Sequence, residues 1–501
     1  MTFMVVMLIV AIAIDYGRAD LEHQRIQRAA DAAALAASHR LGMADQDTSG
    51  PAAAERFFKA NTANREGQEL ESVVLDAVKG EVKVFAGGIV GTSFLSAVGI
   101  QSLTLRAASR VVKGDGKVEV ALVLDNSGSM AGQPIADLTT AAQSLVGVVY
   151  SGSDGYDRVK VAVVPFSGAV NVGPENANAG WIDSAGASPL NGANFSSNVP
   201  RMEMFNRVGV SSNGCVEARA SGYDLTDTAA SAANPATLFV PMFAPDEPDE
   251  GNDAGKSYAN NYLADDGGTC TPQPTVCTSY NRRGQCTNWQ KSALPPAEAQ
   301  SRICKYDGGH IGSGVAGPNY MCDSAPILPL TEEKTDVESK LATLVAKGST
   351  NIAEGVAWGW RTLSPAEPFP EGRPYDTKDN QKVIVLMTDG ANTYSATSNH
   401  NKSWYAAHGY TTSGRLGTTH SSSGYVTRMN QKTATTCANA KAAGVKIYTI
   451  AFRLENDPTT LSLLQSCANE ATMAFRAADG QALIAAFERI GSEISKLRVS
   501  G

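Results

Sequence analysis

The sequence that decides the fold reads V-E-V-A-L-V-L-D-N-S-G-S-M, from Val118 to Met130. Its first part, residues 118–124, is apolar at nearly every position, which is typical of a parallel strand buried on both faces. Asp125 ends this strand, and two hydroxyl residues, Ser127 and Ser129, follow at alternating positions. Open α/β sheets carry their sites beyond the carboxyl ends of such strands. We therefore predict an α/β domain with oxygen ligands for a hard cation at this edge.

Two later segments end in the same kinds of residue. Gly348-Ser349-Thr350-Asn351 lies between two helical patterns, residues 334–347 and 352–363. A second apolar run, Lys382 to Met387, ends in Thr388-Asp389-Gly390. The alternation of strands and helices favours a parallel sheet flanked by helices.

In their order, the three segments resemble von Willebrand factor A (vWA) domains, which have a Rossmann-like fold and a metal-ion-dependent adhesion site. The resemblance implies metal contacts, some through water, from Asp125, Ser127, Ser129, Thr350 and Asp389. Two carboxylates and three hydroxyls suit Mg²⁺, with Mn²⁺ or Ca²⁺ as alternatives. So few formal charges leave the cation able to take an acidic side chain from a protein partner. The alternative is that Asp125 and Asp389 only cap turns and helices.

The N-terminus, Met1 to Ile14, is apolar apart from Thr2. Because about 20 residues are needed to span a bilayer, this run is short. A cleaved signal peptide fits poorly, since no positive region precedes the run and no small-residue cleavage site follows it. We expect a membrane anchor whose upstream residues are missing from this sequence, as a late start-codon assignment would produce. The alternative is a buried core helix.

An Ala-rich helix is predicted to continue this anchor from Asp15 to Leu41. The sequence D-Y-G-R followed by Q-R-A-A-D-A-A-A-L-A-A is similar to the N-terminus of TadG-like proteins of bacterial Tad (Flp) pilus assembly. That family carries an N-terminal membrane segment, and many members carry a C-terminal vWA domain. The chain departs from the family in lacking a basic stretch before the anchor. The orientation in the membrane therefore cannot be inferred from the count of flanking positive charges.

The predicted organisation has three parts. Residues 1–45 form the membrane anchor and Ala-rich helix, and residues 46–113 form a small α+β, pilin-like region. Residues 118–501 form the vWA domain, with insertions at about 168–330 and 391–429. The segment K-G-D-G-K, residues 113–117, is the expected boundary.

Eight cysteines indicate disulfides in an oxidising compartment. Cys437 and Cys467 stand apart from the other six and are predicted to pair. For the six cysteines of the first insertion the alternative is a zinc cluster, although they contain no C-x-x-C pair.

Polar residues dominate both insertions. The first contains the acidic run Asp246-Glu247-Pro248-Asp249-Glu250, which we interpret as a solvated loop face, with Ca²⁺ binding as the alternative. The second is rich in tyrosine and contains His400, His408 and His420. We expect it to be a polar, aromatic surface loop near the metal that shapes partner recognition, with a transition-metal site as the alternative.

A net charge of −8 and the lack of a basic run argue against nucleic-acid binding. Our leading hypothesis is a non-enzymatic, membrane-anchored protein of pilus assembly or adhesion in the bacterial cell envelope. Its vWA domain would be periplasmic or extracellular and would bind a protein partner, not a small-molecule substrate, through the cation. The first alternative is a surface adhesin that binds host or matrix ligands directly. A metal-dependent hydrolase is the second, although the sequence offers no G-x-S-x-G or H-E-x-x-H motif.

Overall fold

The computed structural model describes residues 2–41, 45–63, 65, 67–76, 80–112, 116–151, 158–249, 255–308, 311 and 317–499. The chain divides into two compact units. Unit 1 comprises Met1–Gly116, Tyr150–Arg158 and Lys496–Gly501, and unit 2 comprises Lys117–Val149 and Val159–Ser495. Three residues of the expected boundary segment, 113–115, lie outside the described residues.

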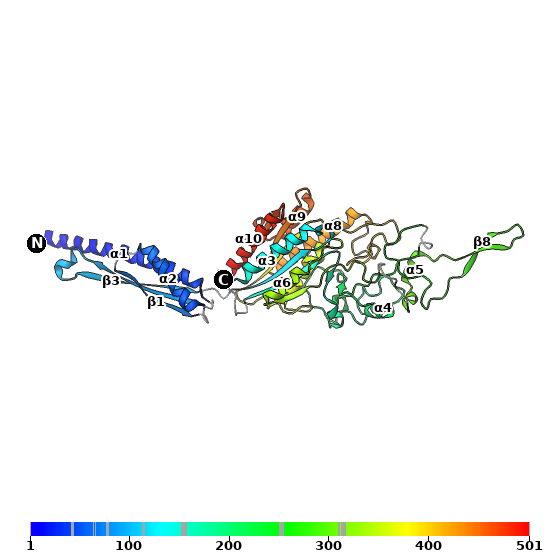
Figure 1. The fold of residues 1–501 in the computed structure, drawn as a ribbon, viewed down its shortest axis with the longest axis horizontal. Coiled ribbons are helices and arrows are strands. Elements are labelled where there is room, and N and C mark those ends of the chain that lie inside the picture. The colour runs from blue at the N-terminus through cyan, green and yellow to red at the C-terminus, as the bar shows by residue number, and fades with distance from the viewer. Residues whose placement is uncertain are drawn as a thin grey trace. The chain divides into compact units, whose positions relative to one another are not determined.

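Unit 2 is built on a six-stranded sheet (Figure 1). Its strands, in spatial order, are β10 (Leu328–Thr331), β5 (Val159–Phe166), β4 (Lys117–Asp125), β11 (Asn380–Thr388), β12 (Lys446–Phe452) and β13 (Ala474–Ala477). The five strands from β5 to β13 are parallel. Strand β4 lies at the centre, and every residue from Val118 to Asp125 is buried, as its apolar sequence predicts.

The prediction of a parallel sheet is wrong for the edge strand β10, which runs antiparallel to β5. The first insertion leaves the sheet after β5, beyond its carboxyl end. The chain returns from that same end, pairing Leu328 with Val163 and then Thr331 with Val161. It can therefore join the sheet without a crossover helix, which a parallel neighbour would need. The sheet is mixed.

Eight helices follow β4 in the described part of the chain. They are α3 (Gln133–Tyr150), α4 (Arg201–Arg207), α5 (Pro296–Ser301), α6 (Lys334–Ala342), α7 (Ile352–Leu363), α8 (Ser422–Ala442), α9 (Pro458–Cys467) and α10 (Gly480–Val499). The last helix is capped by Asp479, whose Oδ1 accepts from the backbone N–H of Ala482 at 2.9 Å. Helix α7 matches its predicted range, 352–363, whereas α8 begins inside the segment predicted as the second insertion.

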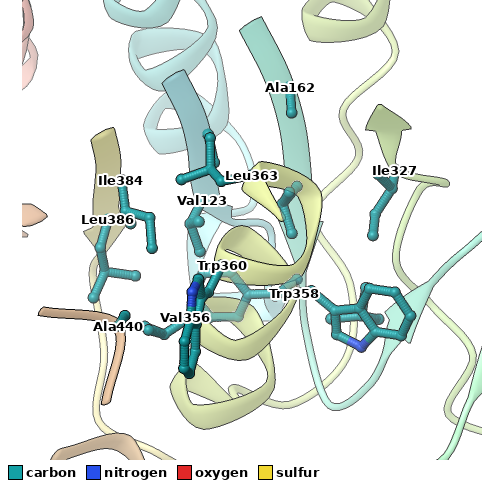
Figure 2. Packing of buried hydrophobic residues seen from close by; sticks show 14 of the residues in the cluster. Val123, Ala162, Ile327, Val356, Trp358, Trp360, Leu363, Ile384, Leu386 and Ala440 are labelled. Carbon is teal, nitrogen blue, oxygen red and sulfur yellow. The ribbon is translucent and has the colours of Figure 1, made fainter. Parts of the chain in front are cut away.

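Helix α7 packs directly onto the sheet and is buried at every position. Figure 2 shows Val356 and Leu363 of this helix among Val123, Ile384 and Leu386 of β4 and β11. Burial of such aliphatic side chains stabilises the domain by roughly 1.5–3 kcal/mol each. This packing fixes the start of α7, which follows the predicted metal loop, against the sheet.

Both insertions fold into one polar and aromatic body. The first insertion contains β6 (Val170–Asn171), β7 (Cys215–Val216) and a hairpin of β8 (Thr275–Tyr280) and β9 (Cys286–Lys291). It has an apolar core of its own, which includes Phe205, Phe243 and Tyr306.

Contacts between the insertions correct the prediction of an aromatic surface loop. Tyr405 and Tyr410 of the second insertion are fully buried. Their hydroxyls donate to Glu217 at 2.5 Å and to Glu247 at 3.1 Å, both in the first insertion. A buried tyrosine hydroxyl requires a hydrogen-bond partner, and the acidic residues of the other insertion provide it. Trp404, in contrast, is exposed.

The acidic run is likewise not a solvated face. Asp246 and Glu247 are buried. The Lys305 Nζ lies 2.7 Å from Asp246 Oδ2, and the backbone N–H of Asn260 donates to Glu247 Oε2 at 2.7 Å. Glu250 lies outside the described residues.

All eight cysteines are paired in four disulfides. The predicted pair Cys437–Cys467 is confirmed and joins α8 to α9. The zinc alternative for the other six is wrong, because they form the disulfides Cys215–Cys322, Cys270–Cys304 and Cys277–Cys286.

Unit 1 contains two helices on a three-stranded antiparallel sheet (Figure 1). Its elements are α1 (Thr2–Ser38), α2 (Gln46–Thr62), β1 (Gln68–Asp76), β2 (Glu81–Gly91), the 3₁₀ turn η1 (Leu95–Val98) and β3 (Ser102–Val112). Helix α1 buries a stripe of alanines against α2 and the sheet, and the small side chains allow close packing. No helix in the described part of the chain is long and apolar enough to cross a membrane.

Candidate metal centre

The five predicted metal ligands come from three segments that meet at the carboxyl ends of β4 and β11. Asp125 is the last residue of β4, and Ser127 and Ser129 lie in the turn that follows. Thr350 lies just before α7, whose N-cap Asn351 accepts from the backbone N–H of Glu354. Asp389 directly follows β11. The neighbouring parallel strands bring these segments to one edge.

Hydrogen bonds connect four of the five residues in one chain. The Asp125 Oδ1 accepts from the backbone N–H of Ser127 at 2.8 Å. The Ser127 and Ser129 hydroxyls lie 3.1 Å apart, and Ser129 donates to Asp389 Oδ1 at 2.7 Å. The carboxylates and hydroxyls therefore lie within one small cluster of oxygen atoms.

The hydroxyl of Thr350 lies close to the same cluster, beside Gly390. A Cβ placed on Gly390 would lie 3.9 Å from both Ser129 Oγ and Thr350 Oγ1. The Thr350 loop is also tied to the turn that follows β4, because the backbone N–H of Gly128 donates to the carbonyl of Gly348 at 2.9 Å. Gly348 has φ +87°, a conformation that a side chain would strain.

Three residues outside the predicted set hold the site in shape. The Thr388 hydroxyl donates to Asp125 Oδ2 at 2.5 Å. Thr393 accepts from the backbone N–H of Thr350 through its hydroxyl, and the side chain of Asn392 accepts from the backbone N–H of Ile352. The T-D-G motif indicates Thr388, but nothing in the sequence pattern singles out Thr393 or Asn392.

The electrostatics of the two carboxylates differ with their depth. Asp125 is fully buried, and burial raises its pKa to about 6. The negative charge of Asp389 adds to this shift, while hydrogen bonds from Thr388 and Ser127 oppose it. Burial also raises the pKa of the half-buried Asp389, against the hydrogen bond from Ser129. No positive charge compensates the burial of Asp125, and for Asp389 the positive charge of Arg453 opposes the shift without cancelling it.

The donor set fits a hard cation. Carboxylate and hydroxyl oxygens are ligands that Mg²⁺ takes in proteins. Ser129 is exposed, so the cluster is accessible from solvent. Among the residues that the structure describes, no group of three or more His, Cys, Asp or Glu side chains is placed to hold a metal. The candidate centre differs from such a group in having only two carboxylates.

The histidines of the second insertion do not form a site together. His400 Nδ1 lies 2.6 Å from the Tyr258 hydroxyl, and His420 Nδ1 lies 3.2 Å from the Tyr425 hydroxyl. His408 is buried beside the ring of Tyr394. These separate surroundings do not support the transition-metal alternative.

Comparison with known proteins identifies the N-terminal segment. Residues 2–53 match the Flp pilus-assembly TadE/G-like family. The predicted TadG-like resemblance is confirmed for this segment, which is 52 of the 501 residues. No curated protein matches the chain.

Several solved structures of pilus proteins are similar to the chain at low identity. The pilus adhesin SpaC from Lactobacillus rhamnosus GG is 12% identical, with a TM-score of 0.33; the match covers 86% of this chain but 34% of SpaC. The vWF domain of the pilus tip protein Mfa5 from Porphyromonas gingivalis is 11% identical, with a TM-score of 0.34 and coverage of 76% and 96%. The pilus adhesin RrgA from Streptococcus pneumoniae is 10% identical, with a TM-score of 0.33 and coverage of 85% and 48%. The chain thus spans about a third of SpaC, the first of these structures.

Proposed function

We propose that this chain is a membrane-anchored envelope protein of pilus assembly or adhesion whose unit 2 binds a protein partner through a divalent cation. The observation that carries the metal site is the convergence of Asp125, Ser127, Ser129, Thr350 and Asp389 at one sheet edge. The TadE/G-like match of residues 2–53 supports the link to pili. The four disulfides support a location outside the cytoplasm.

The five converging residues would hold the cation, partly through water. A bound cation would supply an electrophilic centre with a coordination position open to a partner's carboxylate. The surrounding residues act as a rigid support: Thr388 orients Asp125, and Thr393 orients the Thr350 loop. Mg²⁺ is the proposed cation, with Mn²⁺ or Ca²⁺ as alternatives.

Direct cation binding is the first test. Isothermal titration calorimetry of the full chain with Mg²⁺ should show one binding event that Asp125→Asn removes. Asp336→Asn, at an exposed carboxylate of α6, is the matched control and should bind as the unmodified chain does. Equal Mg²⁺ affinity in the unmodified chain and the Asp125→Asn variant would contradict the site.

Partner binding is the second test. We expect isolated Flp pili to bind the immobilised chain in Mg²⁺, and EDTA or Asp125→Asn to abolish this binding. Purified host matrix proteins form a parallel arm of the experiment. Cation-dependent binding to matrix proteins but not to pili would favour the direct adhesin instead. Pilus binding that survives both EDTA and the substitution would refute the mechanism.

The proposed function is non-enzymatic. Among the described residues, the hydrogen-bond partners of the five site residues include no histidine or glutamate that could act as a general base. Recognition through an open coordination position needs no such base.

A further inference from the structure

The end of unit 1 formed by the β2–β3 turn is apolar and exposed. Phe94, Val98 and Ile100 are 48%, 58% and 46% exposed. Residues 86–105 contain no charged side chain, in a chain that is 18% charged. Twenty successive uncharged residues with outward apolar side chains are unusual for a surface that faces only water.

A buried carboxylate ties this turn to helix α1. Asp15 accepts from the backbone N–H groups of Ser93, Phe94 and Leu95, at 2.9, 2.7 and 2.8 Å. Arg18 adds a hydrogen bond to the Ser93 hydroxyl at 2.7 Å. Figure 1 shows the turn beside the beginning of α1. Asp15 lies in α1 at the end of another uncharged segment, residues 2–14, and thereby ties the uncharged turn to this part of the helix.

Polar groups suited to a membrane interface border this apolar end. Tyr16 is 71% exposed, and tyrosine is enriched where protein meets lipid headgroups. A hollow of about 400 Å³ is lined by Arg18, the residue that bonds Ser93 of the turn, by Arg25 and Arg65, and by Val90 of β2. Glu22 is the one acidic residue in its lining and pairs with both Arg25 and Arg65, at 2.5 and 2.7 Å. Three arginines against this one carboxylate leave the hollow with a net positive charge. Cationic side chains of this kind attract anionic lipid headgroups.

We propose that the β2–β3 turn is a second membrane contact, which dips Phe94, Val98 and Ile100 into the interface of an anionic bilayer. The apolar start of α1 lies beside it, and the arginine hollow receives a headgroup phosphate. Two contacts would fix the tilt of unit 1 on the membrane, which a single helix leaves free. The inference rests on the membrane location in the proposed function and is independent of the metal site.

The disulfides permit a sharp experiment, because the chain has no free thiol. Val98→Cys in the full chain gives one reactive site for an environment-sensitive NBD label. Val74→Cys is the matched control: Val74 is 48% exposed in the same unit, on β1, about 25 Å along the sheet from the turn. Both variants are reconstituted into vesicles of phosphatidylglycerol and phosphatidylcholine.

The label at position 98 should shift to the blue on vesicles and lose fluorescence to doxyl-labelled lipid several-fold more than the label at position 74. Val98→Asp should weaken vesicle binding roughly tenfold relative to Val74→Asp, because an apolar contact is lost and a repelled charge is added. Because Val98 is exposed, we expect neither Val98→Cys nor Val98→Asp to disturb the folding of unit 1.

Three results would overturn the inference. On vesicle-bound protein, iodide in solution could still quench the label at position 98, which would show that the turn remains in water. It could shift to the blue without lipid as protein concentration rises, which shows that a second copy covers the turn. Equal quenching on neutral and anionic vesicles would show that the contact does not depend on anionic lipid, which contradicts the proposed attraction by the arginines of the hollow. A chain that does not bind vesicles at all would instead refute the membrane anchor of the proposed function.

Discussion

Asp125 is a fully buried carboxylate whose burial costs stability. A fully buried carboxylate loses its hydration, and the hydrogen bonds from Ser127 and Thr388 do not fully replace it, as its raised pKa shows. Asp389 adds repulsion because it is linked to the same cluster through Ser129. A divalent cation would remove both costs. This is why we interpret the cluster as a binding site and not as a set of turn caps.

His408 is the residue at which pH should act on folding. Burial lowers its pKa well below the ordinary value of 6.5, and the positive charges of Lys432 and Arg415 lower it further. The histidine is therefore neutral in the folded chain and takes up a proton on unfolding below about pH 6.5. Its contribution to stability is complete above that pH and is lost as the pH falls.

We expect this loss to amount to about 1 kcal/mol between roughly pH 6.5 and 5.5, and His408→Asn to remove it. Urea unfolding followed by tryptophan fluorescence measures the effect. His420→Asn, at an exposed histidine of the same insertion, should keep the pH dependence of the unmodified chain. Parallel pH profiles for His408→Asn and the unmodified chain would contradict the assignment.

At the scale of the element, α7 depends on glycine for its approach to the sheet. A Cβ on Gly359 would lie 2.3 Å from Val123 Cγ2, and one on Gly355 would lie 2.7 Å from the Phe166 ring. Both neighbours are buried and belong to strands of the sheet. Without these glycines the helix could not keep its distance from β4 and β5, and the Thr350 loop at its start would shift.

Alanine substitution separates this packing effect from helix propensity. Alanine favours a helix over glycine by about 1 kcal/mol, so Gly147→Ala, in α3 with open space around it, should stabilise the chain by up to that amount. Gly359→Ala should instead lower the free energy of unfolding by about 1–3 kcal/mol through overcrowding. Urea unfolding measures whether each substitution raises or lowers the free energy of unfolding. Stabilisation by both Gly147→Ala and Gly359→Ala would show that α7 can move away from the sheet to accept a side chain.

The disulfides of unit 2 should differ in their contribution to the free energy of unfolding, according to the elements that they join. Cys437–Cys467 links two helices of the core and closes a loop of 30 residues. Replacing both cysteines by alanine should cost about 3–4 kcal/mol in the chain-entropy description. Cys277–Cys286 joins the two strands of an exposed hairpin. Its replacement by serines should leave the urea midpoint of the core unchanged, and an equal shift for both pairs would contradict this distinction.

For the whole molecule, the tryptophans allow one unit to be followed within the full chain. All five lie in unit 2: Trp181, Trp289, Trp358, Trp360 and Trp404. Fluorescence therefore reports the unfolding of the unit that carries the candidate metal centre.

The proposed site predicts that Mg²⁺ stabilises unit 2, because a ligand that binds the folded state and not the unfolded chain shifts the equilibrium toward the folded state. At roughly 100 times its dissociation constant, the gain is about 2.7 kcal/mol. The urea midpoint from tryptophan fluorescence should rise in Mg²⁺ and return to its starting value in EDTA. Asp125→Asn should show no such rise; a midpoint that is insensitive to Mg²⁺ in the unmodified chain would count against the centre.

The local sequence was sufficient to predict features that depend on one segment of the chain. The apolar run before Asp125 identified β4, the helical pattern of residues 352–363 identified α7, and the isolated pair Cys437 and Cys467 was predicted correctly. It failed where the outcome depended on distant partners. Asp246 and the tyrosines of the second insertion look like surface residues, and only Lys305 and the acidic residues of the other insertion explain their burial.

The sequence by itself determined the repeating strand-and-helix order, the identity of the five candidate ligands and the TadE/G-like N-terminal segment, because each is written in contiguous residues. The tertiary structure decided the antiparallel edge strand β10, the joint packing of the two insertions, the support of Asp125 and Thr350 by Thr388 and Thr393, and the attachment of the β2–β3 turn to Asp15. Each of these depends on hydrogen bonds or packing between residues far apart in the chain, and the free energy of such contacts has no local pattern to reveal it.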